Sequence, residues 1–180
     1  MRTLMLIDLQ NDFVGRLPPT ISARVVANTN ELLAHFSRLG LPIVVVETER
    51  RPDGSDSLPM ARAEGKLEAV VGTRGAETAT GLELPPRTRR IVKTKYSAFF
   101  GTSLTETVSA ESTSLVVCGV NTHACVRATV VDAVQLDFEV EVAGECIASY
   151  DQELHDESLR YFRRRLAPVR TNRAILEDTR

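Results

Sequence analysis

Cysteine is scarce in this sequence, and long hydrophobic runs are absent. Three cysteines in 180 residues are an odd number in a chain large enough to form its own core, which argues against a disulfide framework. No apolar run approaches the ~20 residues that span a bilayer. The apolar start at residues 4–7 ends at Asp8, before it reaches the ~7–15 residues of a signal-peptide core. We therefore expect a cytoplasmic protein without a membrane segment.

An excess of positive charge is also missing. The chain has 22 Lys and Arg residues against 24 Asp and Glu residues, which is a formal net charge of −2. No electrostatic field therefore attracts nucleic acid or an anionic membrane, and we expect neither as a partner. The hydrophobic content of 43% is ordinary for a globular protein. The length fits a single domain over residues 1–180.

Strand and helix patterns alternate along the chain. Short apolar runs predict strands, and apolar stripes with a helical period predict helices. The expected strands are residues 3–7, 41–46, 91–92, 114–120, 138–142 and, at an edge, 168–171. The expected helices are 20–39, 122–136 and 151–166, with one short helix within 60–70. This order indicates an α/β fold, a three-layer α/β/α sandwich with a mainly parallel sheet. The irregular stretch 48–88 is long for a loop and predicts a binding segment.

An acidic residue follows the first strand, at the carboxyl end where ligands bind in such folds. Asp8 comes directly after residues 3–7. Partial burial there raises the pKa of a carboxyl group and suits it to accept a proton. Aspartate also favours turns and helix caps, so a structural role for Asp8 stays open. Asp12 is the more typical cap of the two.

Two lysines follow the strand at residues 91–92. Lys93 and Lys95 belong to a segment that also contains Tyr96 and two phenylalanines. If the strand continues, both lysines point to the same side, so the spacing does not decide which one faces a site. One interpretation is a cation beside a flat apolar wall. The other is a solvated lysine pair next to core aromatics.

A cysteine lies where the buried strand 114–120 leads into a helix. If Thr122 caps that helix, Cys125 is in its first turn. The unpaired backbone N–H groups there lower the pKa of a thiol and can donate to an oxyanion. A buried structural cysteine is the alternative for Cys125, and it is our interpretation of Cys118 and Cys146.

Histidine is too scattered to indicate a metal site or a catalytic dyad. His123 lies two residues before Cys125 and does not face it on a helix, which disfavours a Cys–His pair. The three histidines form no His-x-His or His-x-x-x-His pair, so a zinc or iron site has little support. No glycine-rich phosphate loop follows a strand, which argues against nucleotide binding. We expect no metal and no cofactor.

Three segments together resemble the isochorismatase-like cysteine hydrolases. They are Leu-Ile-Asp-Leu-Gln-Asn-Asp-Phe around Asp8, Lys93 before Tyr-Ser-Ala-Phe-Phe-Gly-Thr, and Gly-Val-Asn-Thr-His-Ala-Cys-Val around Cys125. The resemblance runs in order from residue 3 to about residue 176. This family belongs to the superfamily of isochorismatases, nicotinamidases and N-carbamoylsarcosine amidases. The resemblance implies a six-stranded parallel sheet flanked by helices.

The resemblance also implies a catalytic triad of Asp8, Lys93 and Cys125. Cys125 would be the nucleophile, which forms a thioester or a related acyl-enzyme with a carbonyl substrate. Asp8 would take the thiol proton and later activate water. Lys93 would hold the thiolate and the carboxylate in place electrostatically.

A cis peptide bond and an oxyanion site are implied as well. The cis bond would join Val120 and Asn121, a non-proline bond of a kind tolerated mainly at functional sites. It would aim the backbone N–H groups of Asn121 and Cys125 at the oxyanion. The candidates for the wall of the substrate pocket are Phe13, Tyr96 and the 48–60 loop.

Departures from the family pattern bear on the substrate. Nicotinamidases of this family carry a metal site of an aspartate and histidines after the second strand, whereas residues 47–54 here contain no histidine. The resemblance therefore points away from a metal-dependent nicotinamidase. True isochorismatases lack the nucleophilic cysteine, so Cys125 points to amide, carbamoyl or ureido substrates. Glu145 stands where the family usually has aspartate, which we interpret as a conservative structural change.

The expected function is thus a metal-independent cysteine hydrolase of a small C–N bond. One alternative is a vinyl-ether hydrolase that uses Asp8 and Lys93 and leaves Cys125 idle. Another is a non-catalytic small-molecule-binding protein, against which the intact triad argues. The resemblance implies a homo-oligomer, a dimer or a tetramer. The apolar side chains of residues 122–136 suit either a subunit contact or the core of one subunit.

Overall fold

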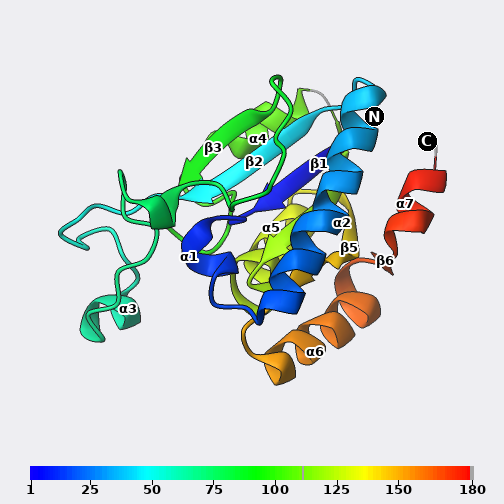
Figure 1. Cartoon of the computed structure of the whole chain (residues 1–180). Coiled ribbons are helices and arrows are strands. Elements are labelled where there is room, and N and C mark those ends of the chain that lie inside the picture. The colour runs from blue at the N-terminus through cyan, green and yellow to red at the C-terminus, as the bar shows by residue number, and fades with distance from the viewer. Residues whose placement is uncertain (111, 179–180) are drawn as a thin grey trace.

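Six parallel strands form one sheet in the order β3-β2-β1-β4-β5-β6 (Figure 1). The computed structural model describes residues 1–110 and 112–178, so the predicted domain 1–180 includes three positions outside the described residues. The strands are β1 (Arg2–Ile7), β2 (Ile43–Thr48), β3 (Arg89–Lys93), β4 (Ser114–Val120), β5 (Glu139–Ala148) and β6 (Val169–Arg170). The predicted α/β fold with a parallel sheet is confirmed, and β6 is an edge strand as expected.

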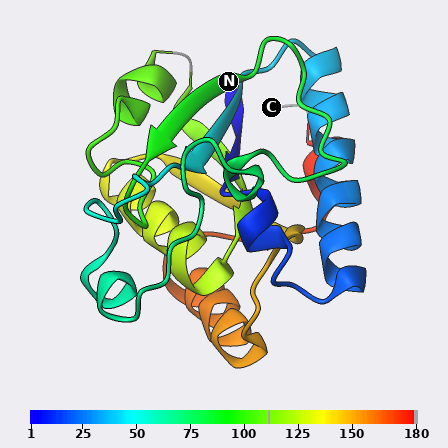
Figure 2. The same cartoon turned by 60° about the vertical axis from the view of Figure 1, so that its left-hand side comes forward.

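Helices cover both faces of the sheet (Figures 1 and 2). One face packs against α1 (Asn11–Val14), α2 (Pro19–Arg38) and α7 (Asn172–Glu177), and the other against α4 (Leu104–Ser109), α5 (Arg127–Gln135) and α6 (Gln152–Tyr161). Leu4 and Leu6 of β1 face the first layer, whereas Met5 and Ile7 face the second. Because successive side chains of a strand point to opposite faces, a run without a polar face is buried along its whole length.

Several elements differ from the prediction. β5 continues past residue 142 to Ala148, because it pairs with β4 on both sides of a register shift between Val117 and Gly119. The two later predicted helices each contain a π-helical turn, η2 (Thr122–Val126) and η3 (Phe162–Leu166). The short helices α1, α4 and α7 were not predicted, because four to six residues carry no readable helical stripe.

The irregular segment between β2 and β3 contains little regular structure. It holds α3 (Pro59–Ala63), inside the region predicted for a short helix except for its first residue, and the 3₁₀ turn η1 (Arg74–Ala76). Within the described part of the chain, no helix combines the length and apolar character needed to cross a membrane.

The carboxyl ends of four strands meet at one edge of the sheet. Ile7 of β1 pairs in register with Val46 of β2 and with Gly119 of β4. Thr48 pairs with Lys93 where β2 and β3 end. The residues that follow these strands therefore lie around one place.

Candidate active site

A buried lysine joins the residues at this edge. The side chain of Lys93 is fully buried, and its Nζ atom lies 2.7 Å from Asp8 Oδ2 and 3.4 Å from Cys125 Sγ. Nζ also donates to Thr48 Oγ1 and to the Lys95 carbonyl oxygen, each at 2.9 Å. The structure thus brings together three side chains that the sequence singled out, although 85 residues separate Asp8 from Lys93.

The structure also distinguishes the two lysines that the spacing left open. Lys93 is the last residue of β3 and points into the site. β3 ends there, so Lys95 does not follow the strand alternation. Its Nζ instead donates to the Asp56 carbonyl oxygen at 2.8 Å. Lys95 therefore ties the loop after β2 to the segment after β3.

Both carboxylate oxygens of Asp8 are engaged inside the site. Oδ2 accepts from Lys93, and Oδ1 accepts from the hydroxyl of Thr48 at 2.9 Å. The backbone of Asp8 has φ 51°, a left-handed conformation that costs about 1 kcal/mol or more for a residue other than glycine. Its N–H donates to the Val46 carbonyl oxygen at 2.9 Å, which helps to hold this turn.

Thr48 and Gln10 were not identified from the sequence. The Thr48 hydroxyl bridges Asp8 and Lys93, since it donates to the carboxylate and accepts from the ammonium. The buried Gln10 amide pairs with the backbone of Thr48 through two hydrogen bonds of 2.8 Å, as a neighbouring strand would. The spacing Asp-x-Gln was the available signal for Gln10. The sequence carried no such signal for Thr48, because its position beside Lys93 depends on the register of β2 with β3.

Cys125 lies in the π-helical turn η2, directly before α5. The N-cap residue of this turn is Asn121, and no side chain caps it. The hydroxyl of Thr122 is instead 2.8 Å from His155 Nδ1, so the assignment of Thr122 as the cap is wrong. The peptide bond between Val120 and Asn121 is cis. The Asn121 carbonyl oxygen accepts from the N–H groups of two residues of the turn, Ala124 and Val126.

The expected lowering of the Cys125 pKa is also wrong. Burial raises the pKa of the Cys125 thiol well above its usual range, and the nearby Asp8 carboxylate raises it further. The charge of Lys93 acts in the opposite direction but does not compensate. Burial also works against the charged form of Lys93. The charge of Asp8 and the hydrogen bonds to Asp8 and Cys125 outweigh it, so the pKa of Lys93 is raised and the ammonium stays charged.

The other cysteines are structural, as expected. Cys118 and Cys146 are fully buried. The expectation that Asp12 is a cap is wrong, because Asp12 lies inside α1 and its carboxylate accepts from the N–H of Ala69 at 2.7 Å. Glu145 accepts from the backbone N–H of the first residue of α7 at 2.6 Å.

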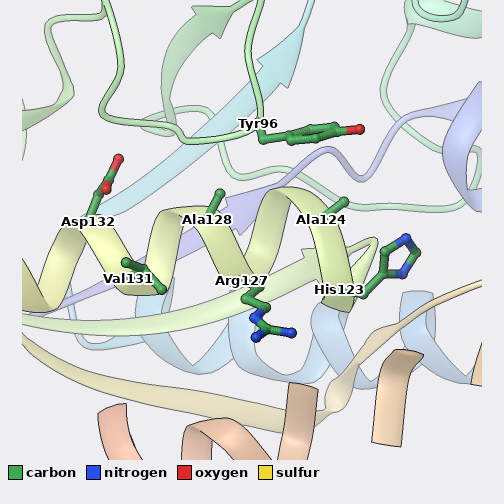
Figure 3. A pocket seen from close by; sticks show the side chains of 7 residues that line it. All are labelled: Tyr96, His123, Ala124, Arg127, Ala128, Val131 and Asp132. Atoms are coloured by element: carbon green, nitrogen blue, oxygen red, sulfur yellow. The ribbon is translucent and has the colours of Figure 1, made fainter. Parts of the chain in front are cut away.

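A hollow of about 440 Å³ adjoins the turn that carries Cys125 (Figure 3). It is lined by Tyr96, His123, Ala124, Arg127, Ala128, Val131 and Asp132. Figure 3 shows the ring of Tyr96 facing Ala124 and Ala128 across the hollow. Phe13, the other predicted wall residue, is buried in the core cluster that includes Leu9 and Val14. A role of Phe13 in substrate binding stays a prediction.

The donor set around β2 does not fit a metal ion. The buried carboxylate of Glu47 pairs with Arg90 at 2.5 Å and accepts from the Thr78 hydroxyl at 2.7 Å. Among residues 1–110 and 112–178, no three His, Cys, Asp or Glu side chains form a cluster that could hold a metal.

Comparison with known proteins gives consistent matches along the chain. The sequence model of the isochorismatase domain matches residues 2–174. A probable inactive nicotinamidase of Arabidopsis thaliana is 34% identical over 162 residues, which cover 84% of this chain and 83% of that protein.

Two solved structures share the fold. An isochorismatase family protein from Desulfovibrio vulgaris has a TM-score of 0.84 and 30% identity, covering 97% of this chain and 95% of its own. An N-carbamoylsarcosine amidase from Thermoplasma acidophilum has a TM-score of 0.80 and 27% identity, covering 95% and 96%.

Proposed function

The chain belongs to the isochorismatase family, and we propose that it is a cysteine hydrolase that cleaves the C–N bond of a small amide, carbamoyl or ureido substrate without a metal ion. One observation carries this proposal. The Lys93 ammonium lies between the Asp8 carboxylate and the Cys125 sulfur, in a site buried from solvent except at the cysteine. A base, a nucleophile and a fixed positive charge are thus in mutual reach.

The first half-reaction forms an acyl-enzyme. The proton of the Cys125 thiol moves to the Asp8 carboxylate as the sulfur attacks the carbonyl carbon, and the carbonyl electron pair moves onto oxygen. When this tetrahedral species collapses, the C–N bond breaks and the Asp8 carboxylic acid returns the proton to the leaving nitrogen. Ammonia or an amine departs, and a thioester remains on Cys125.

The second half-reaction consumes one water molecule. The Asp8 carboxylate takes a proton from water, whose oxygen attacks the thioester carbon. The C–S bond breaks, and the proton returns to sulfur. The sum is amide plus water giving carboxylic acid plus ammonia or amine, with Asp8 and Cys125 restored.

The electrostatics of the site support this assignment of roles. Since burial and Asp8 raise the pKa of the Cys125 thiol, the resting nucleophile is protonated and needs a base at the moment of attack. Lys93 stabilises negative charge on Asp8 and on sulfur in turn, because its ammonium contacts both. The backbone N–H groups of Asn121 and Cys125 are the proposed donors to the developing oxyanion.

The similarity to an N-carbamoylsarcosine amidase supports hydrolysis of a C–N bond. The similarity to a probable inactive nicotinamidase favours a non-catalytic small-molecule-binding protein as the second candidate. Hydrolysis of a vinyl ether by Asp8 and Lys93 would leave Cys125 idle.

A substitution of the nucleophile tests the proposal. We expect Cys125→Ala to reduce ammonia release from a panel of small amides and ureides by at least about 10³-fold, because no other group can form the acyl-enzyme. The melting temperature should stay within a few degrees of the wild-type value, since the side chain is small and partly exposed.

The matched control is Cys146→Ala, which removes a buried thiol that contacts Asn172 rather than the site. Turnover should persist in this variant. Full turnover by Cys125→Ala would contradict the cysteine mechanism and favour vinyl-ether-type chemistry. Absence of turnover in the wild type, with Cys125 inert to acylating substrates, would favour the binding protein.

A further inference from the structure

Arg50 is a buried cation at the same edge of the sheet as the site. It lies two residues after the end of β2 and is only 8% exposed. Its Nη1 atom donates to the Thr94 carbonyl oxygen at 3.2 Å. Among residues 1–110 and 112–178, no carboxylate lies within ion-pair distance of its guanidinium group.

The backbone of Arg50 is held from both sides. Its N–H donates to the Ala69 carbonyl oxygen at 2.9 Å, and its own carbonyl accepts from the N–H of Val71 at 3.0 Å. These bonds form a parallel bridge between Arg50 and Val70. The guanidinium group is therefore positioned before any ligand arrives, which lowers the entropic cost of binding one.

Arg50 reaches the segment that carries the catalytic lysine. Thr94, its hydrogen-bond partner, directly follows Lys93, whose own Nζ donates to the Lys95 carbonyl oxygen. Two cations thus hold consecutive carbonyl groups of one segment. Tyr96, in the same segment, faces the hollow beside Cys125 (Figure 3).

The electrostatic environment of Tyr96 links Arg50 to the site. Burial raises the pKa of the Tyr96 hydroxyl, and Cys125 raises it further, whereas Arg50 acts to lower it. The hydrogen bond to Thr94 brings the guanidinium group to the segment of Lys93 and Tyr96, and the effect on the Tyr96 pKa agrees with that position.

Three other cations in this region have anionic partners, whereas Lys95 donates to the Asp56 carbonyl oxygen. The three pairs are Lys93 with Asp8, Arg127 with Glu157, and Arg16 with Glu68. A largely buried guanidinium group without a counter-charge is unfavourable, and a ligand anion would compensate it. Its planar fork of N–H donors matches a carboxylate in two parallel hydrogen bonds.

We propose that Arg50 binds a carboxylate of the substrate, so that the substrates are small amides or ureides carrying a carboxylate a few atoms from the scissile C–N bond. The nature of the scissile bond rests on the proposed function. The carboxylate site itself does not depend on Cys125 being the nucleophile. Arg50 is a specificity-determining residue in this scheme.

The test measures binding to the Cys125→Ala protein, in which turnover cannot interfere. The probes are two pairs that differ only in the carboxylate: malonamate with malonamide, and N-carbamoylglycine with N-carbamoylglycinamide. By calorimetry, we expect a carboxylate member to bind about 10- to 100-fold more tightly than its neutral partner. Adding Arg50→Gln should remove this preference and leave the affinity for the neutral probes within about twofold.

Two further variants keep the result interpretable. Arg51→Gln removes the exposed neighbouring arginine and should leave the preference intact. Arg50→Lys keeps the positive charge but loses the planar set of N–H donors, so it should retain part of the preference for carboxylate probes. This variant tests the charge even if Arg50→Gln lowers the melting temperature. Equal binding within both pairs, an Arg50→Gln variant with an unchanged preference, or no binding of either carboxylate probe would overturn the proposal.

Failure of the proposed function gives a different result. In that case the wild-type enzyme would release no ammonia from any probe, while Arg50 would still discriminate the carboxylate members in the binding experiment. Failure of the Arg50 proposal alone would leave Cys125-dependent turnover of amides with no preference for a carboxylate.

Discussion

At the scale of single residues, the chemistry of the site depends on buried charges that control one another. Lys93 stays charged in a buried position because Asp8 and Cys125 lie beside it. Thr48 joins the carboxylate and the ammonium through one hydroxyl group, so neither charge is left without a hydrogen bond. Besides burial, Asp8 raises the pKa of the Cys125 thiol, whereas Lys93 lowers it. Each of these groups therefore changes the protonation of the others.

This coupling predicts the pH dependence of alkylation at Cys125. Iodoacetamide reacts with the thiolate, so the labelling midpoint in the wild type should lie above the value of about 8.5 for a free thiol. Asp8→Asn should shift the midpoint down by about one pH unit, because it removes a charge that raises the thiol pKa. Lys93→Met should shift it up. Mass spectrometry of the labelled peptides measures each midpoint.

The buried thiols of Cys118 and Cys146 are internal controls for unfolding during labelling. A wild-type labelling midpoint below that of a free thiol would contradict this prediction.

The raised pKa of the Cys125 thiol also makes the stability of the fold depend on pH. Since the unfolded thiol ionises at a lower pH than folded Cys125, rising pH above about 8.5 favours the unfolded state. The stability that this thiol contributes is present below that pH and is lost as the pH rises.

At the scale of elements, the end of β4 must approach β1 closely for the site to form. Gly119 has φ +133°, and a Cβ atom built there would lie 2.1 Å from the Ile7 carbonyl oxygen. The position is next to the register shift of β4 against β5 and two residues before Asn121. A glycine here therefore allows β4 to enter the turn that carries Cys125.

We expect Gly119→Ala to lower the free energy of unfolding by at least about 3 kcal/mol, because the contact is with backbone atoms that cannot move aside. Urea denaturation measures the loss. The control is Gly40→Ala, which also has a positive φ, of +68°, but no atom within 4 Å of the added Cβ. That change should cost about 1 kcal/mol, from backbone strain alone. Equal losses in the two variants would contradict the steric argument.

At the scale of the whole molecule, Arg2 near the start of the chain binds residues of the C-terminal segment. Arg2 donates from Nη1 to the carbonyl oxygens of Ile175 and Asp178 at 3.3 and 2.8 Å. Its Nη2 lies 3.0 Å from Glu141 Oε2, and Arg170 pairs with the other oxygen of this carboxylate. The amino end of β1 is thereby joined to β5 and α7, at the end of the sheet opposite the site.

Arg2→Met should lower the free energy of unfolding by about 2–3 kcal/mol, because it leaves buried acceptors unpaired. Labelling of Cys125 in the folded state should not change, because Arg2 is far from the site along β1. Arg173→Met is the control, since its pair with Glu177 is exposed and contributes about 0.5 kcal/mol or less. Thermal or urea unfolding checks both values. A loss in Arg173→Met as large as in Arg2→Met would contradict this ranking.

Assembly and location stay predictions at this scale. Val126 and Val130 of the helical segment 122–135 are buried within the described chain, which favours the core interpretation of these two side chains. Val131 lines the hollow instead. A dimer or tetramer and a cytoplasmic location remain to be measured, for example by sedimentation of the purified protein and by fractionation of cells.

The sequence by itself determined the features that depend on neighbouring residues. Apolar runs without a polar face predicted β1 and β4. Asp8 comes directly after β1, and Cys125 lies in the turn that follows β4. Short elements such as α4 escaped prediction because six residues carry too little periodicity. Local sequence is sufficient to predict long strands and the residues that follow them, because the covalent chain fixes the distances between neighbouring residues.

Only the tertiary structure decided how the charges interact. It selected Lys93 over Lys95, placed the Thr48 hydroxyl between two ionised groups, and left Arg50 without a carboxylate among the described residues. It also reversed the expected pKa shift of Cys125. The physical reason is that burial and electrostatic energy depend on distances between groups that lie tens of residues apart in the chain. Those distances are set by strand register and loop packing.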